Sequence, residues 1–199
     1  MNKKRILISF LILTVILITV SCSTDDKEVE TSIIKRAELT DKEETLIKGT
    51  GINHSFVFEY QENNNDVEKV DIWIEKYLGG EKIGPLLKTT NPVNNDAEKY
   101  IMFNMSIIQD VNTWSISFIE GKNISTGKID SNNDLGKTST WDMVESIQVD
   151  DGEYILAAFV GNDGNTINGI PNDFFSQPEE YMSEVLNNDY VYLLKVKLY

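Results

Sequence analysis

"VDIWIEKY", residues 70–77, alternates aliphatic side chains with polar or amphipathic ones. One side of the extended chain carries Val70, Ile72 and Ile74, and the other side carries Asp71, Trp73, Glu75 and Tyr77. Successive side chains of a β-strand point to opposite faces of its sheet. A period of two therefore predicts a strand with its aliphatic face on a core.

The same period recurs in four other stretches, which are HSFVFEYQ (54–61), YIMFNMSII (100–108), TWSISFI (113–119) and YVYLLKVKLY (190–199). Segments rich in Asn, Asp, Gly and Pro separate the predicted strands, at 63–66, 79–80, 91–92, 131–134 and 162–165. Many short alternating strands joined by such turns are typical of an antiparallel β-sandwich or barrel. We expect a mainly β fold, with residues 33–199 forming a single domain.

One segment near the C-terminus departs from the β pattern. In FFSQPEEYMSEVLNNDY (174–190), Ser176 suits an N-cap and Pro178 the first helical turn. Apolar residues four apart follow, as the pairs Tyr181 with Val185 and Met182 with Leu186. The sequence thus predicts one short helix, which we expect to cover one end of the sandwich.

The N-terminus has the three zones of a secretory signal. Three basic residues at positions 3–5 precede an apolar run from Ile6 to Val20, and Cys22 follows. Fifteen helical residues reach about 22 Å, which is short of the roughly 30 Å of a bilayer core. We therefore expect residues 1–21 to be a signal peptide rather than a spanning helix.

The segment Thr19-Val20-Ser21-Cys22 resembles a bacterial lipobox, although Thr19 stands where lipoproteins usually carry leucine. The resemblance implies that Cys22 is acylated with palmitate-type chains and holds the protein at the cell membrane or outer membrane, on its extracytoplasmic side. An ordinary cleaved signal or an uncleaved anchor is the alternative. The polar residues 22–32 lack apolar side chains for a core, so we interpret them as a flexible tether.

A second resemblance concerns VDDGEYILAAFV (149–160). Tyr154 begins an apolar strand just after the Asp151-Gly152 turn, which is similar to the tyrosine corner of immunoglobulin-like sandwiches. This resemblance favours an antiparallel Ig-like β-sandwich over a closed barrel. It implies that the Tyr154 hydroxyl bonds back to the connection before its strand.

Charge and composition exclude several functions. The chain has 32 acidic and 18 basic residues; the leader holds three of the basic ones and no acid, so residues 22–199 carry a net charge of −17. Such a surface repels nucleic acid.

With His54 as the single histidine, histidine-based triads and zinc sites are unsupported, and we expect no cofactor and no metal. Asp130, Asn132 and Asp134 have a calcium-like spacing, but the later EF-hand positions do not match, which favours a polar turn.

Aromatic side chains are the best indication of binding. Trp73 and Tyr77 fall on the polar face of their strand, and Trp141 follows a Ser- and Thr-rich loop. We take these three as a candidate binding face for a protein or glycan partner, the alternative being that another element covers them. The expected function is a non-catalytic, lipid-anchored binding or accessory module at the cell surface. A structural surface lipoprotein and, last, a carboxylate-based hydrolase are the alternatives.

Overall fold

Alternating strands form two antiparallel sheets in the computed structural model, which describes residues 31–63, 67–94, 97–109, 111–132 and 135–199. The predicted signal peptide, Cys22 and nearly all of the predicted tether lie outside the described residues. Thr31–Tyr199 is one compact unit. Its first strand begins at Ser32, one residue before the predicted start of the domain.

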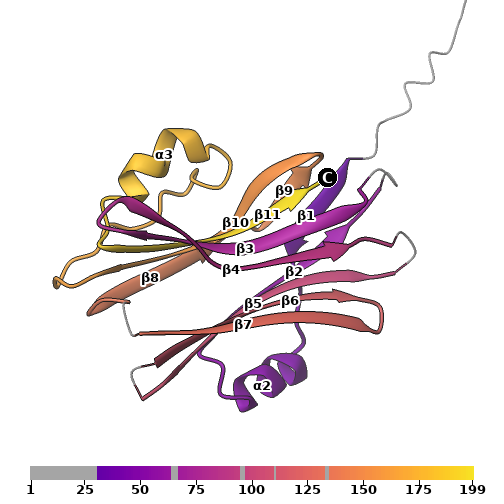
Figure 1. Cartoon of the computed structure of the whole chain (residues 1–199), viewed down its shortest axis with the longest axis horizontal. Coiled ribbons are helices and arrows are strands. Elements are labelled where there is room, and N and C mark those ends of the chain that lie inside the picture. The colour runs from indigo at the N-terminus through magenta and orange to yellow at the C-terminus, as the bar shows by residue number, and fades with distance from the viewer. Residues whose placement is uncertain (1–30, 64–66, 95–96, 110, 133–134) are drawn as a thin grey trace, which may run out of the picture. The chain divides into compact units, whose positions relative to one another are not determined.

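The six-stranded sheet has the order β7-β6-β5-β2-β1-β9. Its strands are β1 (Ser32–Arg36), β2 (His54–Gln61), β5 (Lys99–Ile108), β6 (Val111–Glu120), β7 (Asn123–Asn132) and β9 (Ser146–Val149). The five-stranded sheet has the order β4-β3-β11-β10-β8. It consists of β3 (Lys69–Leu78), β4 (Glu81–Pro92), β8 (Thr138–Met143), β10 (Gly152–Asn162) and β11 (Tyr190–Leu198). Figure 1 shows the two sheets as the layers of a sandwich.

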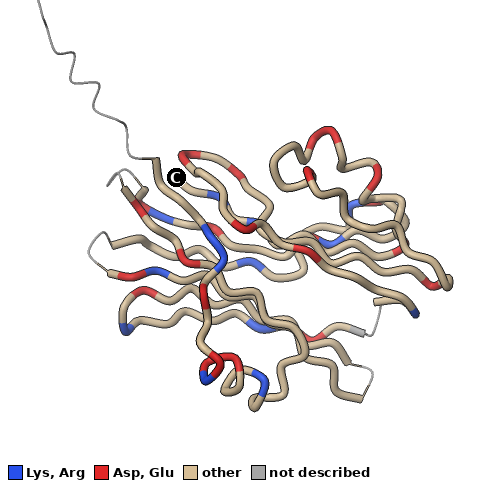
Figure 2. The backbone as a smooth tube through the Cα atoms, turned by 180° about the vertical axis from the view of Figure 1, so that it is seen from behind, with Lys and Arg blue, Asp and Glu red and all other residues tan. Residues whose placement is uncertain are grey.

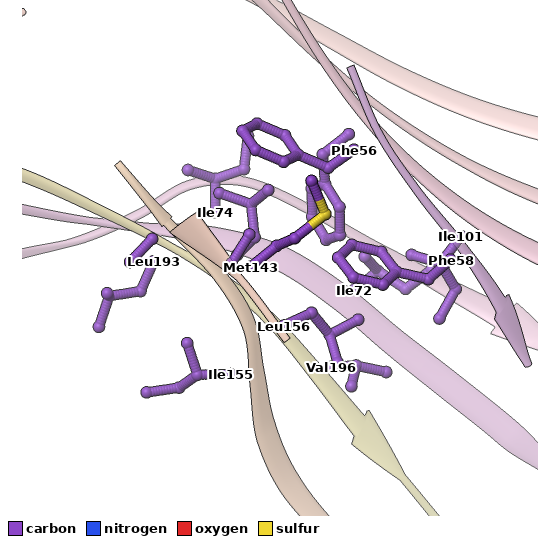
Figure 3. Close-up of a cluster of buried hydrophobic side chains, with 14 of the residues drawn as sticks. Phe56, Phe58, Ile72, Ile74, Ile101, Met143, Ile155, Leu156, Leu193 and Val196 are labelled. Atoms are coloured by element: carbon purple, nitrogen blue, oxygen red, sulfur yellow. The ribbon is translucent and has the colours of Figure 1, made fainter. Parts of the chain in front are cut away.

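The prediction of a mainly β, antiparallel sandwich is confirmed. The core lies between the sheets and takes the side chains that the period of two placed on one face. Figure 3 shows Met143 between Phe56 and Phe58, with Ile72 and Ile101 nearby. The other fully buried core side chains of the predicted strands include Val70, Ile74, Phe103, Met105, Trp114, Ile116, Tyr192, Leu194 and Val196.

Tyr154 makes the hydrogen bonds that the tyrosine-corner resemblance implied. Its hydroxyl accepts a bond from the backbone N–H of Asp150 at 3.0 Å and donates to Asp150 Oδ1 at 2.5 Å. The phenol thereby ties the start of β10 to the end of β9, where the chain passes from one sheet to the other. With eleven strands in the described residues, the sandwich is larger than the about seven to nine strands of immunoglobulin domains.

The described residues contain two helices, so the prediction of one was incomplete. α3 (Pro178–Val185) is the expected helix and lies over one end of the five-stranded sheet (Figure 1). Its N-cap is Gln177 rather than Ser176, whose hydroxyl instead donates to the carbonyl of Asp173. The unexpected helix is α2 (Asp41–Gly49), between β1 and β2. Neither helix is long and apolar enough to cross a membrane.

The two long sides of the sandwich differ. Along one side, β4 packs against β7 so closely that a Cβ atom on Gly127 would lie 3.0 Å from Thr89 Cγ2. On the other side, Trp141 of β8 contacts His54 and Phe56 of β2, and the chain between β1 and β2 leaves the sheet to form α2. We call this second side the open edge.

Candidate functional site

β1 is shorter than β2, and this difference creates the open edge. The two strands pair from Ile33 with Gln61 to Arg36 with Phe58, and the Ala37 N–H donates one further bond to the Val57 carbonyl at 2.9 Å. β2 continues to His54 and is paired there only with β5. The first residues of β2 therefore have one side without a paired strand, and Trp141 of β8 in the other sheet contacts them there.

Aromatic rings join the two sheets at this point. The Trp141 indole of β8 meets Phe56 edge-on, with centroids 5.3 Å apart and ring planes at 82°. It meets His54 at 6.1 Å and 70°, and His54 in turn contacts Phe159 at 5.8 Å. Phe56 and Phe159 are buried, but Trp141 is 42% exposed. The core thus ends at the open edge in an indole that solvent reaches.

A pocket of about 750 Å³ lies beside this indole, and we call it the edge pocket. It is lined by the end of β1, the segments on either side of α2, the start of β2 and the junction between β8 and β9. The lining residues that matter for its chemistry are Arg36, Ile47, Asn53, His54, Trp141 and Glu145. Its volume falls in the range of about 300–1,000 Å³ that is usual for small-molecule sites.

α2 forms one wall of the edge pocket, through Glu44, Ile47 and Lys48. The helix begins with a capping box, in which the Thr40 side chain accepts from the Glu43 N–H and the Glu43 carboxylate accepts from the Thr40 N–H. No α2 residue is buried. Local hydrogen bonds, rather than core packing, therefore hold this wall.

Charge in the edge pocket is balanced, in contrast to the acidic chain as a whole. Three basic and three acidic side chains line it. Arg36 pairs with Glu145 at 3.2 Å, and Lys48 pairs with Glu44 at 3.0 Å. Figure 2 likewise shows basic residues spread among acidic ones along the strands and on α2. Both pocket ion pairs are solvent-exposed, so they contribute little to stability and can open to a ligand.

His54 is half-buried between Trp141 and Phe159. Burial lowers the pKa of its imidazole below the usual value, so the ring is neutral at pH 7. No hydrogen bond joins either ring nitrogen to another residue in the described part of the chain. A neutral imidazole offers one N–H donor and one acceptor, and both remain available to a ligand in the edge pocket.

The structure separates the three residues of the predicted binding face. Trp73 and Tyr77 are each only 8% exposed, and they lie on the outer face of the five-stranded sheet. β11 and β10 stand between their strand and β8, which carries Trp141. Of the three, only Trp141 is exposed, and only Trp141 lines the edge pocket.

Lysine side chains from the two neighbouring strands, β4 and β11, lie over Trp73. Lys88 Nζ lies 5.4 Å and Lys195 Nζ 5.9 Å from the centroid of its indole. Lys88 binds Asp71 at 2.7 Å, and Lys195 binds both Glu75 and Glu153 at 2.7 Å. We call Asp71, Glu75, Lys88, Glu153 and Lys195 the charged layer. Because each of its carboxylates and ammonium groups has a partner of opposite charge, this face of the sheet can be buried although it carries charged residues.

The pKa values on this outer face have opposing causes. Burial by itself raises the pKa of Glu75, but the bonds from Lys195 and Lys82 outweigh it and hold that pKa below its usual value. Burial likewise lowers the pKa of Lys195, but Glu153 and Glu75 outweigh it and raise that pKa. Glu75 and Lys195 therefore both stay charged at neutral pH, which fits a structural layer.

Sequence reasoning missed most of the edge pocket. The sequence identified His54 only as the single histidine of the chain, with no catalytic or metal-binding partner. The pattern Thr40-x-x-Glu43 was a readable sign of a helix start, and it could have located the α2 wall. Within the described residues, no cluster of three or more His, Cys, Asp or Glu side chains could hold a metal ion.

Comparison with protein families gives one assignment, since the family model described as the YgaN domain matches residues 33–198. The chain belongs to the YgaN domain family. The match covers both sheets, both helices and every residue of the edge pocket named above. No curated protein and no solved structure matched the chain. The edge pocket is thus a feature of this chain's YgaN domain.

Proposed function

We propose that the chain is a lipid-anchored binding module on the extracytoplasmic side of a bacterial envelope, and that the edge pocket of its YgaN domain is the ligand site. One observation carries the second half of this proposal. Trp141 is a large aromatic side chain left 42% exposed, beside a pocket of about 750 Å³ with balanced charges. Aromatic residues at such positions are common anchors for ligands, because they offer contact area with little loss of entropy.

The anchor half of the proposal rests on Cys22 and its distance from the fold. Residues 23–31 separate Cys22 from the start of β1, and nine extended residues reach at most about 32 Å. An acylated Cys22 would therefore tether the folded domain to the membrane through a short segment. Cys22→Ala should abolish labelling by a palmitate analogue, and unchanged labelling would contradict the anchor.

We assign the edge pocket to binding rather than to catalysis. Of its three acidic side chains, Glu44 and Glu145 are each paired with a basic residue, which leaves Glu38 as the one unpaired carboxylate within the described lining. A carboxylate hydrolase needs an acid and a base that face one substrate, and pairing both with cations works against that arrangement. A structural lipoprotein without a ligand is the remaining alternative, and it predicts that nothing occupies the edge pocket.

Protection of an introduced thiol tests both halves together. Ser146 lies in the edge pocket, and Ile124, at 68% exposure on β7, lies outside it. In intact cells, a membrane-impermeant maleimide should label Ser146→Cys and Ile124→Cys, because both thiols face outward. The unmodified chain measures any background from Cys22.

Addition of a solubilised cell-envelope extract distinguishes binding from a structural role. It should slow the labelling of Ser146→Cys and leave that of Ile124→Cys unchanged. Equal rates for Ser146→Cys with and without the extract would contradict the ligand site. Failure to label either thiol in intact cells would contradict the extracytoplasmic location.

A further inference from the structure

The chemistry of the edge pocket points to one class of ligand. We propose that it binds an uncharged saccharide of one or two rings, stacked on the Trp141 indole. This inference rests on the proposed function and names its ligand. Three features of the pocket support it: the solvent exposure of the indole, the set of unpaired polar groups beside it, and the balance of its charges.

The Trp141 indole is exposed, and its aromatic neighbours His54 and Phe56 are not stacked on it. Phe56 and His54 meet Trp141 at interplanar angles of 82° and 70°, so neither ring lies flat against it. The described residues include no ring stacked on this indole, and solvent reaches it. A sugar ring has an apolar face of C–H groups, which can lie on an indole much as another flat apolar group does.

Polar groups around the indole match hydroxyl groups, which both donate and accept. Asn53 Oδ1 accepts from the Ile107 N–H at 2.7 Å, which orients the amide and leaves its Nδ2 donors free. His54 offers one donor and one acceptor. Glu38 also lines the pocket, and no hydrogen bond or ion pair within the described residues engages its carboxylate. The pocket thus offers both hydrogen-bond donors, from Asn53 and His54, and hydrogen-bond acceptors, from His54 and Glu38.

The charge pattern argues against a charged ligand. The three basic groups of the pocket are each paired, Lys35 with Glu59 at 3.3 Å and the other two as described above. A polyanion would have to displace these carboxylates while approaching a chain of net charge −14. A cationic ligand would compete with the lysine and arginine side chains already present. An uncharged polar ligand meets neither obstacle.

The test uses the full chain in detergent micelles, with ¹⁵N-labelled tryptophan. Trp73, Trp114 and Trp141 give three indole N–H signals, and the spectrum of Trp141→Phe identifies the third. The neutral probes are N,N′-diacetylchitobiose, cellobiose and maltose. An anionic digalacturonate and the peptide trialanine are the comparison probes. At least one neutral disaccharide should shift the Trp141 signal while the signals of the two buried tryptophans stay in place.

Variants then assign the effect to stacking. Trp141→Ala should weaken the affinity for the active disaccharide by about tenfold or more. Trp141→Phe should weaken it less, because a flat ring remains. Ile124→Ala removes an exposed apolar side chain outside the pocket and should leave the affinity unchanged. Equal affinity of Trp141→Ala and the unmodified chain would overturn the proposal.

The outcomes separate the ligand class from the proposed function. A Trp141 shift with digalacturonate or trialanine, and with no neutral sugar, would overturn the saccharide while leaving a ligand site in the edge pocket. No shift with any probe, combined with protection of Ser146→Cys by envelope extract, would also overturn the saccharide alone. No shift and no protection would overturn both.

Discussion

Trp73→Ala tests whether the outer face of the five-stranded sheet is a structural layer or a binding surface. The indole is 8% exposed and lies under the side chains of Lys88 and Lys195. Removing a buried tryptophan costs about 3–5 kcal/mol. The two cation–π contacts belong to this loss, at about 0.5–1 kcal/mol each. Because flexible lysine stems can collapse into the space, we expect the lower end, about 3 kcal/mol.

Urea unfolding followed by circular dichroism measures this loss. With a slope of about 2 kcal/mol per molar urea, the midpoint should fall by about 1.5 M. Trp141→Ala is the matched control, since it makes the same change at an indole that is 42% exposed; its cost should be about 1 kcal/mol. If Trp73→Ala shifted the midpoint no more than Trp141→Ala does, the assignment of Trp73 to a structural layer would be refuted.

Three other predictions follow from local contacts. Tyr154→Phe should cost about 1–2 kcal/mol in urea unfolding, since it removes both bonds to Asp150; no change in the midpoint would contradict the tyrosine corner. The NMR titration of His54 should give a pKa below the roughly 6.5 of an unfolded chain. Because the folded pKa is the lower one, the contribution of His54 to stability is complete above about pH 6.5 and declines as the pH falls through the folded pKa; this part of the pH dependence should vanish in His54→Gln. Thr40→Ala should speed hydrogen exchange in α2 without moving the global midpoint, because no α2 residue is buried; slower global refolding or a lower midpoint would contradict that local role.

The sandwich was predictable because each strand has its own period of two. In the predicted strand at 54–61, the period of two puts Phe56, Phe58 and Tyr60 on one face, and all three are buried. Helix α3 was predictable too, because Pro178 marks its start and Val185 anchors it in the core. α2 escaped prediction because Leu46 and Ile47 are its only large apolar residues and neither is buried, and helix prediction depends mainly on an extended apolar stripe.

The binding face was harder to predict because burial depends on partners from distant strands. Trp73 lies on the face of its strand opposite the aliphatic residues, and this position suggested that its indole is exposed to solvent. It is covered by Lys195, which is far away in sequence, and a lysine stem can bury an aromatic ring as well as an aliphatic side chain can. The edge pocket depends on β2 extending to His54, past the end of β1 at Arg36, and on the contact of β8 with that end of β2. A local sequence pattern predicts neither relation.

Quenching of tryptophan fluorescence by acrylamide tests most directly whether the edge pocket is the ligand site. In the full chain, Trp141 should supply nearly all of the quenchable emission, since Trp73 and Trp114 are buried, and Trp141→Phe should remove that component. Adding the soluble polysaccharide fraction of the cell envelope should shield Trp141 and reduce the quenching constant of this component by at least about half at saturation. Unchanged quenching, while the fraction binds the protein in a sedimentation assay, would contradict the account.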